Sequence, residues 1–375
     1  MRVEIRHSCA EADSYRANRV KSLFNAESGA NFALDADLDI DDAGWRIGVV
    51  VGPSGSGKSS LGARLGPLYN PRWPKDAPII DAIAPEGDFG SVTGALSAVG
   101  LGSVPAWLRP YSVLSNGERF RATLARLVCD APKLAVVDEF SSVVDRQIAR
   151  IGAGAFAKAW RRTGGQAVLL SCHYDILDWL QPDWVFDTGT GQFQRGLLRR
   201  RPAIELEVWQ TDWRYWPLFE PHHYLKLPQM IAATCYVAAV GGEPVAHLGV
   251  STRPGLVEAR ACRLVVMPEW QGAGVGMRFL NAVCEAWRRG ENRYTKPMPT
   301  LFHTSHPGLA AALRRDTNWT QVSARLHGDH KGRSMASIQA SAERIGAKAP
   351  GATGYGGHFR AVQGFRYLGA PCGSS

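Results

Sequence analysis

The feature that most constrains this chain is a glycine-rich loop of eight residues, 52–59, with the sequence GPSGSGKS. It fits the pattern G-x-x-x-x-G-K-S, in which backbone N–H groups surround a phosphate. The apolar run IGVVV (47–51) before it predicts a buried strand, and the pattern after it predicts a helix. Because the positive end of a helix attracts anions, this order of strand, loop and helix indicates a phosphate site rather than a plain glycine-serine turn.

The residues of the loop also predict its chemistry. We expect Lys58 to reach the β- and γ-phosphates of a nucleoside triphosphate, and the Ser59 hydroxyl to bind Mg²⁺. The loop as a whole is expected to contact the phosphates. The predicted nucleotide-binding set is Gly52, Pro53, Ser54, Gly55, Ser56, Gly57, Lys58, Ser59 and Ser60.

Two carboxylates end a second apolar run. The sequence LAVV (134–137) predicts a buried strand, and Asp138 and Glu139 follow it directly. In α/β sheets, the C-terminal end of such a strand is where metal ligands and water-activating groups lie. We therefore expect Asp138 to bind Mg²⁺ through water and Glu139 to polarise the attacking water.

The order of these motifs resembles the ABC-type ATPases. A segment LSNGE (114–118) stands between the loop and the carboxylates, and a further apolar strand ends just before His173. The resemblance covers about residues 32–193. It implies ATP hydrolysis at the interface of a head-to-tail homodimer, where Ser115 and Gly117 of one protomer meet the γ-phosphate held by the other. It also implies that His173 senses that phosphate; a buried histidine with a structural role is the alternative.

The sequence departs from the family pattern in three places. Asn116 replaces the usual second glycine of the signature segment, and no glutamine lies between Ser59 and Leu114. That interval is also short, so we expect a trimmed helical subdomain. In transporters this subdomain couples to membrane subunits, and its reduction favours an ATP switch without a membrane partner. Two equivalents stay open, with Asp81 or Glu86 for the missing glutamine and Phe24 or Phe32 for an aromatic residue that stacks on adenine.

Length and composition set the outer limits. A chain of 375 residues predicts two domains, and the segment RRRP (199–202) marks the expected boundary between domains 1–200 and 201–375. The formal net charge of +9 is compatible with a nucleic-acid partner and does not by itself require one. The seven cysteines form no C-x-x-C pair and the N-terminus has no apolar core, which together predict reduced thiols and a cytoplasmic location.

The second half opens with three expected strands, about 231–240, 244–251 and 256–267, and then the loop QGAGVG (271–276) before a helical pattern. A glycine-rich turn after a strand is also typical of dinucleotide folds, but the antiparallel order of these strands argues against one. The segment instead resembles the GNAT acyltransferases over about residues 206–368. The resemblance implies an acetyl-CoA site in which helix N-terminal amides bind the pyrophosphate. The residues implied are Val265, Val266 and Met267 for the pantetheine arm, and Gln271, Gly272, Ala273, Gly274, Val275 and Gly276 for the pyrophosphate.

Candidate catalytic groups of the transferase half stay open. His303 and Ser305 follow the next expected strand, near the place where the thioester would lie, together with His306. Glu258 precedes the acetyl-CoA loop on its strand and is a candidate base. None of these matches a fixed family position, so a structural role is the alternative for each. The aromatic residues crowded between 209 and 224 either stack a base or wall an acceptor pocket, or plug the space between domains.

The fold class predicted is α/β, with a P-loop ABC-type ATPase domain that has a trimmed helical subdomain, followed by a GNAT-like α+β acyltransferase domain. This arrangement resembles a small family of ABC-type ATPases fused to a predicted acetyltransferase domain. It implies MgATP and acetyl-CoA as ligands and transfer of an acetyl group to an amine, with nucleic acid as one candidate acceptor. The competing interpretation is an SMC-like, nucleic-acid-binding clamp or sensor whose second domain is not catalytic. A transporter subunit ranks third.

Overall fold

The computed structural model describes residues 1–24, 31–40, 44–196, 201–225, 230, 233–252, 257–325 and 361–369. The chain forms two compact units, each built from two segments. Unit 1 contains residues 1–75 and 114–202, and unit 2 contains residues 76–113 and 203–375. We call residues 76–113 the insert, because they interrupt unit 1 in the sequence and pack in unit 2. The domain division at residue 200 stays a prediction.

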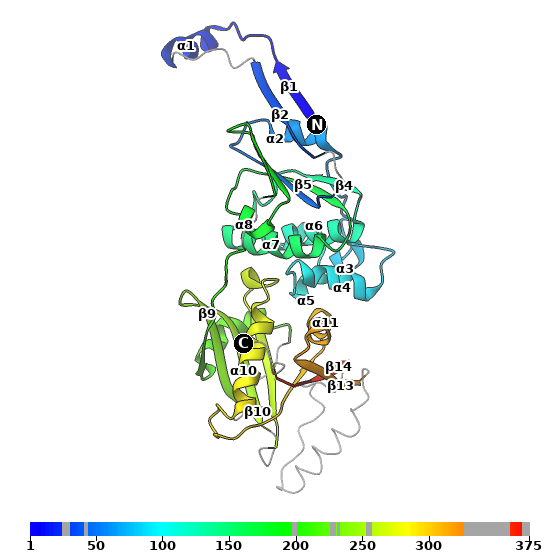
Figure 1. Ribbon diagram of the computed structural model, residues 1–375, viewed down its shortest axis with the longest axis vertical. Helices are drawn as coiled ribbons and strands as arrows, with labels where there is room; N and C mark the ends of the chain where they lie inside the picture. The colour runs from blue at the N-terminus through cyan, green and yellow to red at the C-terminus, as the bar shows by residue number, and fades with distance from the viewer. Residues whose placement is uncertain are drawn as a thin grey trace. The chain divides into compact units, whose positions relative to one another are not determined.

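Unit 1 is organised around a central sheet (Figure 1). Within the described residues, its strands run in the order β4 (Leu134–Val137), β5 (Gln166–Ser171), β3 (Ile47–Val51), β6 (Trp184–Asp187) and β7 (Gln192–Arg195). The first four are parallel, and β7 pairs antiparallel with β6. All five residues of β3 are buried, as its uninterrupted apolar run predicts for a central parallel strand.

Helices cover both faces of this sheet. On one face α2 (Lys58–Leu65) packs on β3, β4 and β5, while α6 (Asn116–Asp130) and α7 (Arg146–Trp160) lie on the other (Figure 1). The short helix α8 (Leu177–Leu180) packs against α7.

A hairpin made of β1 (Arg2–Ser8) and β2 (Asn31–Asp37) joins the apolar core on the α2 side, and α1 (Tyr15–Phe24) lies between its two strands in sequence. Leu34 and Ala36 of β2 are buried while Asp35 and Asp37 are exposed, which is the alternation typical of a strand with one face in the core.

Unit 2 contains a sheet of seven strands among its described residues. Their order is β13 (Trp319–Arg325), β14 (Val362–Tyr367), β12 (Thr300–Thr304), β11 (Ala259–Val266), β10 (Glu243–Thr252), β9 (Thr234–Val240) and β8 (Glu207–Thr211). Strands β9 to β11 form the antiparallel meander that the sequence predicts, and β8, which is not among the predicted strands, pairs antiparallel with β9. The neighbours β11 and β12 are parallel, and they pair only through Ala259, Arg260 and Ala261 of β11. Beyond that point the two strands separate.

The two faces of this sheet carry different helices. The long helix α10 (Val275–Arg289) packs on β10, β11 and β12, with Gly276 against the Val266 side chain. The Val265 side chain instead joins a cluster with the short helix α9 (Trp216–Phe219), flanked by η2 (Trp213–Tyr215) and η3 (Glu220–His222). Because neighbouring residues of a strand point to opposite faces, α9 and α10 cover opposite sides.

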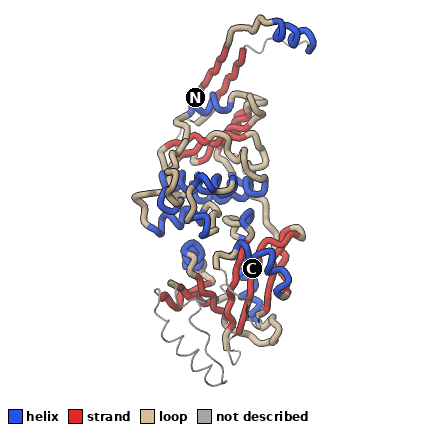
Figure 2. Tube along the Cα trace, turned by 180° about the vertical axis from the view of Figure 1, so that it is seen from behind, coloured by secondary structure: helices blue, strands red, loops and turns tan. Residues whose placement is uncertain are grey.

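The insert is helical and packs beside α11 (Pro307–Arg315). It contains α3 (Ile79–Ala82), α4 (Phe89–Ala98), α5 (Val104–Trp107) and η1 (Tyr111–Val113), and α4 contacts α11. Figure 2 shows how helices, strands and loops alternate along the described chain. Residues 328–354, expected to form a loop with a short helix, lie outside the described residues. Among the helices that are described, none has the length and apolar character needed to cross a bilayer.

Gly48 in the centre of β3 tests the packing of unit 1. A Cβ atom added there would lie 2.0 Å from two ring atoms of Trp184, which is 1% exposed. We expect Gly48→Ala to destabilise unit 1 by about 1–3 kcal/mol, since the core must shift to admit the methyl group. Thermal unfolding followed by circular dichroism measures the loss, at about 2–4 °C for each kcal/mol.

Gly154→Ala is the matched control in α7 of the same unit. Its added Cβ would meet its nearest atoms at 3.4 Å or more, which is ordinary contact. We expect an unchanged or raised melting temperature, because alanine favours helix over glycine by about 0.5–1 kcal/mol. An equal loss in both variants would contradict the proposed Trp184 contact.

Candidate functional site

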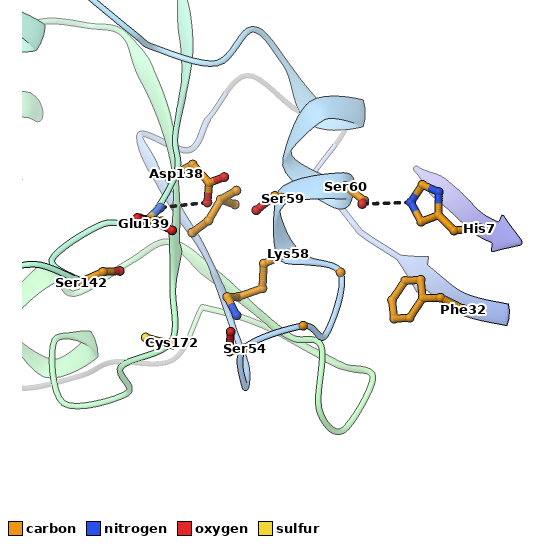
Figure 3. A pocket seen from close by; sticks show the side chains of 13 residues that line it. His7, Phe32, Ser54, Lys58, Ser59, Ser60, Asp138, Glu139, Ser142 and Cys172 are labelled. Carbon is orange, nitrogen blue, oxygen red and sulfur yellow. Dashed lines mark hydrogen bonds between the residues drawn. The ribbon is translucent and has the colours of Figure 1, made fainter. Parts of the chain in front are cut away.

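A cavity of about 360 Å³ lies at the glycine-rich loop of unit 1 (Figure 3). Its lining residues come from five parts of the chain that are distant in sequence. Its lining residues are His7, Phe32, Ser54, Gly55, Gly57, Lys58, Ser59, Ser60, Asp138, Glu139, Ser142, Leu170 and Cys172. The structure therefore brings together the loop and the two carboxylates, as their positions after β3 and β4 of one parallel sheet predict.

The backbone of the loop is shaped to receive an anion. Gly55 and Gly57 have φ of +79° and +86°, a conformation that favours glycine. The first hydrogen bond of the α2 turn runs from Leu61 N–H to the Gly57 carbonyl. Among the described residues, no acceptor is bonded to the N–H groups of Gly55, Gly57, Lys58 and Ser59. These residues fit a phosphate group, because helix N-terminal amides leave donors that a bound anion satisfies.

Close contacts hold the loop in this shape. The Ser56 hydroxyl donates to the Pro53 carbonyl at 2.7 Å and also pairs with the Thr188 hydroxyl. A Cβ at Gly52 would lie 2.0 Å from the same Thr188 oxygen. Lys58 Nζ donates to the carbonyls of Gly52 (2.8 Å) and Pro53 (2.7 Å). The lysine is thus held across the loop, within reach of the cavity that it lines.

The carboxylates of Asp138 and Glu139 reach the cavity from the end of β4 (Figure 3). The Asp138 side chain accepts the Glu139 N–H at 2.8 Å, and Glu139 has φ of +50°. Such backbone is strained in a residue other than glycine and tends to occur at functional sites. Over the described part of the chain, no group of three or more His, Cys, Asp or Glu could hold a metal ion alone. The Ser59 hydroxyl and Asp138 fit a Mg²⁺ ion that completes its ligand set with phosphate and water.

The N-terminal hairpin contributes two residues to this cavity. His7 of β1 and Phe32 of β2 have ring centroids 6.0 Å apart at 24°, and His7 Nε2 lies 3.0 Å from the Ser60 hydroxyl (Figure 3). Of the two adenine-stacking candidates, Phe32 lines the cavity and Phe24 does not. No sequence pattern points to His7, because its place depends on the pairing of β1 with β2.

His173 lies near the cavity's rim but is absent from its lining, where its neighbour Cys172 stands. Its Nδ1 lies 3.1 Å from Nη1 of Arg146, and a guanidinium can only donate. The neutral ring therefore carries its proton on Nε2. Burial, and then the nearby Arg146 charge, lower the pKa of His173, so the ring is neutral near pH 7. Asp175 binds both Arg146 and Arg150, which fixes this arrangement.

The signature segment forms the N-terminus of α6. The Ser115 hydroxyl accepts from Glu118 N–H at 3.3 Å, and Glu118 accepts from Ser115 N–H at 2.9 Å, which completes a capping box. A Cβ at Gly117 would lie 3.0 Å from Ile148 of α7, so glycine permits the close packing of these helices. Ser115 and Gly117 are absent from the lining of the cavity, and Ser115 is exposed on the surface of unit 1.

Unit 2 contains a second loop of the same kind, residues 271–276. Gly272 and Gly274 have φ of +90° and +80°, and a Cβ at Gly274 would meet nothing within 4 Å. The first hydrogen bond of the α10 turn runs from Arg278 N–H to the Gly274 carbonyl. In the region described, the N–H groups of five residues here have no bonded acceptor. They belong to Gly272, Gly274, Val275, Gly276 and Met277.

The separation of β11 from β12 opens beside this loop. Arg263 of β11 has φ of +56°, and the pairing with β10 shifts register there, as in a β-bulge. The edge of residues 262–266 that faces β12 has no strand partner in the described sheet. On this strand the Val266 carbonyl accepts from Gln271 Nε2 at 3.0 Å, and Met267 N–H donates to Val245 at 2.9 Å. The gap and the free amides fit an extended pantetheine arm and a pyrophosphate.

The candidate catalytic residues of unit 2 lie at different ends of this gap. Glu258 precedes β11, at the end where the strands are paired, while His303 and Ser305 lie where they have separated. The Ser305 hydroxyl is buried and has no hydrogen-bond partner within the described residues. His303 is exposed and lies beside Gly364 of β14. Glu258 is thus remote from the loop, and Ser305 is close to the gap with a polar atom still unsatisfied.

The aromatic residues between 209 and 224 pack largely on β10. Trp216 and Phe219 are almost fully buried, and their rings lie 5.2 Å and 5.7 Å from the His247 ring. Burial lowers the pKa of His247 to about 4, so its ring is neutral. These buried members belong to the core of unit 2, which limits base stacking to the exposed ones.

A second cavity of unit 1, of about 710 Å³, is lined by cations. They are Lys158, Arg161, Arg162, Arg195 and Arg201. Asp183, the lining carboxylate, already accepts from the backbone N–H groups of Arg46 and Ile47. The side chains of Lys158 and Arg162 have no bonded partner in the described structure. Burial, followed by the Arg161 charge, lowers the pKa of Arg201.

Comparisons with known proteins bear on both halves. A family model described as an acetyltransferase (GNAT) domain matches residues 232–313, which confirms the expected resemblance of the second half. No curated protein matches the sequence.

Among solved structures, the chain is similar to a bacterial ABC transporter cassette solved as a dimer. The identity is 12% over 44% of this chain and 92% of that one, with a TM-score of 0.35. The same cassette in a post-hydrolysis state bound to ADP and phosphate is 12% identical over 45% of this chain and 94% of that one, with a TM-score of 0.35. A bacterial Atm1-family ABC exporter with ATP bound is 17% identical over 44% of this chain and 34% of that one, with a TM-score of 0.32.

Gly57 and Gly55 provide a matched test of the nucleotide cavity. Both have positive φ, but a Cβ at Gly57 would lie 2.4 Å from the Phe32 ring, whereas a Cβ at Gly55 would meet nothing within 4 Å. Strain alone costs about 1–3 kcal/mol in either variant. We expect Gly57→Ala to lose about tenfold more affinity for a fluorescent ATP analogue than Gly55→Ala, because Phe32 must also move. Equal losses would contradict a role for Phe32 in shaping the site.

Proposed function

We propose that this protein hydrolyses ATP in unit 1 and transfers an acyl group from acetyl-CoA to an amine in unit 2. One observation carries the proposal. Each unit has a glycine-rich loop with N–H groups that have no acceptor in the described structure, and each loop leads into a helix, α2 of 8 residues or α10 of 15 residues. One loop fits a triphosphate beside two carboxylates. The other fits a coenzyme's pyrophosphate beside an open strand edge.

In unit 1, each residue would act from its observed place. Lys58 would exchange the Gly52 and Pro53 carbonyls for phosphate oxygens, and Ser59 and Asp138 would hold Mg²⁺. When bound, Mg²⁺ supplies positive charge that stabilises the leaving diphosphate. Glu139 would orient the attacking water and take up its proton, while the bond between the γ-phosphorus and the bridging oxygen of ADP breaks. The products are ADP and phosphate.

In unit 2, the free amides of the α10 loop would bind the pyrophosphate, and the open edge of β11 would align the pantetheine arm. The acceptor nitrogen attacks the thioester carbonyl, the C–S bond breaks, and the amine loses a proton while the thiolate gains one. The Ser305 hydroxyl is buried and has no hydrogen-bond partner among the described residues, and it would donate a proton to the departing thiolate sulfur. His303 is exposed and suits a proton acceptor better than the remote Glu258.

A head-to-tail homodimer would complete the ATP site. Ser115 stands at the exposed N-terminus of α6, and neither it nor Gly117 reaches the cavity of its own chain. The N-terminus of a 15-residue helix is a natural contact for the γ-phosphate held by another protomer.

Nucleic acid is the acceptor class that the charge distribution favours. The cationic cavity of unit 1 presents Lys158 and Arg162 without partners in the described structure, and the whole chain carries a formal charge of +9. Phosphodiesters are the common partners of such surfaces. The competing function, a clamp or sensor with a non-catalytic second unit, rests on the same cavity. Calorimetry with acetyl-CoA separates the two, because a non-catalytic scaffold without the coenzyme site gives no heat.

Glu139→Gln tests the hydrolytic role. The substitution keeps the shape of the side chain and removes its capacity to accept a proton. We expect the ATPase rate to fall by about 10²–10⁴-fold while ATP affinity changes little. Phosphate release and binding of a fluorescent ATP analogue measure the two quantities. Asp145→Asn, outside the cavity lining, is the control, and an unchanged rate in Glu139→Gln would exclude this role.

Group transfer is tested with labelled acetyl-CoA. We expect mass spectrometry to find acetylated product after incubation with ATP and a panel of RNA, tRNA, DNA and small amines. Gly274→Val, which fills the open space over the loop, is expected to abolish product without changing ATP hydrolysis. Product from small amines but not from nucleic acids, with no nucleic-acid binding at low salt, would remove the nucleic-acid acceptor. Absence of both acetyl-CoA binding and product would favour the clamp.

A further inference from the structure

Within unit 2, the insert contacts the acyl-CoA loop and the start of α11 through the backbone of one residue, Gly102. Gly102 lies in the turn between α4 and α5. Its N–H donates to Gln271 Oε1 at 3.0 Å, and its carbonyl accepts from His306 Nε2 at 3.1 Å. We call these three residues the Gly102 junction.

Gln271 and His306 connect Gly102 to both sides of the gap between β11 and β12. Gln271 is the first residue of the loop, and its Nε2 donates to the Val266 carbonyl at the end of β11. One side-chain amide therefore ties the insert to the loop and to the strand beside it. His306 follows β12 and caps α11, where its Nδ1 accepts from Leu309 N–H at 3.2 Å. The same imidazole therefore ties the insert to the other arm.

The tautomer of His306 is fixed by these two bonds. Nδ1 accepts from a backbone N–H, so the proton of the neutral ring lies on Nε2, where it is donated to Gly102. Burial lowers the pKa of His306, which keeps the ring neutral near pH 7. Both functions of the ring are thus in use, and neither is left for proton transfer with a substrate.

Packing around the junction is close and specific. The Trp107 ring of α5 meets the His306 ring edge-on at 5.3 Å, while its indole N–H donates to the Leu101 carbonyl at 2.7 Å. A Cβ at Gly308 of α11 would lie 2.0 Å from the Ser97 hydroxyl of α4. Because α4 and α11 approach with no room for another atom, a shift of the insert must move α11 or break these contacts.

The insert is also continuous with the ATPase half of the chain. It begins at Asp76 and ends at Val113, and Leu114 and Ser115 of the signature segment follow at once. Leu114 is buried at 3% exposure, so this end of the insert is anchored. A change at the signature helix therefore reaches the insert through one intervening residue of the backbone.

We propose that the Gly102 junction couples the binding of acyl-CoA to the nucleotide state of the ATPase half. The inference rests on the proposed function and adds its regulation. With the junction formed, Gln271 holds the loop in the shape that presents its amides, so acyl-CoA meets a preorganised site. A nucleotide state that draws Gly102 away releases Gln271 and His306 and weakens acyl-CoA binding. By linkage, acyl-CoA then changes ATP affinity by the same factor.

The test measures this factor from both sides. With hydrolysis blocked by Glu139→Gln, calorimetry gives the acetyl-CoA dissociation constant with and without ATP, and the ATP dissociation constant with and without acetyl-CoA. We expect both constants to change by one common factor, about 5–150-fold. In the same background, Gln271→Leu removes both amide bonds, and Gly102→Pro removes the Gly102 N–H while leaving the loop intact. We expect the factor to fall to about one in each, with ATP affinity alone retained.

Gly94→Ala, on the exposed side of α4 with open space around the added Cβ, is the control and should keep the full factor. Melting curves and retained ATP binding show that the variants are folded. If both ligands bind but neither affects the other, the coupling is excluded and the proposed function stands. If the factor survives in both junction variants, the Gly102 junction is not the route. If acetyl-CoA does not bind while ATP does, the transferase function fails, and this inference fails with it.

Discussion

Both candidate sites depend on backbone N–H groups that donate to no acceptor within the described residues. The first turn of a helix always leaves donors without intrahelical partners, and proteins commonly satisfy them with a capping side chain. α6 does so with the Ser115–Glu118 capping box, and α4 does so with Asp88. The helices α2 and α10 have glycine caps in the left-handed conformation and no capping side chain. In both helices, the unbonded N–H groups lie in a glycine-rich loop that is shaped for an anion. These groups are the physical basis for the proposed ATP and acetyl-CoA sites.

Most of the fold, and the positions of the two glycine-rich loops within it, could be predicted from the sequence, because the patterns that determine them are local. The apolar run 47–51 and the alternation in β2 fix strands through burial alone. The glycines at 55, 57, 272 and 274 mark backbone that other residues adopt only under strain. Asp138 and Glu139 follow a strand that is parallel to β3 through β5, so sheet topology carries them to the loop. Each of these inferences needs no knowledge of a distant partner.

What the sequence could not predict depends on pairings between distant segments. His7 reaches the cavity because β1 pairs with β2, and nothing in residues 1–30 indicates that register. The packing of the insert within unit 2 depends on Gly308 and on the backbone of Gly102. No sequence pattern marks either glycine as a contact. The buried side of the aromatic cluster is likewise decided by contact with His247 on β10. Local spacing carries no record of such contacts.

The insert follows the phosphate loop in the sequence and precedes the signature helix. Under the proposed function, it is therefore well placed to respond to the nucleotide state of unit 1. Such a segment transmits a change only if its far side holds something with two discrete arrangements. The coupling that we propose requires the Gly102 junction to be such an element, with its hydrogen bonds to Gln271 and His306 either made or broken. The close packing of α4 on α11 leaves little room for intermediate positions. Close packing on α11 therefore supports the proposal that the insert acts as a stiff link to the candidate acyl-CoA loop of its own chain.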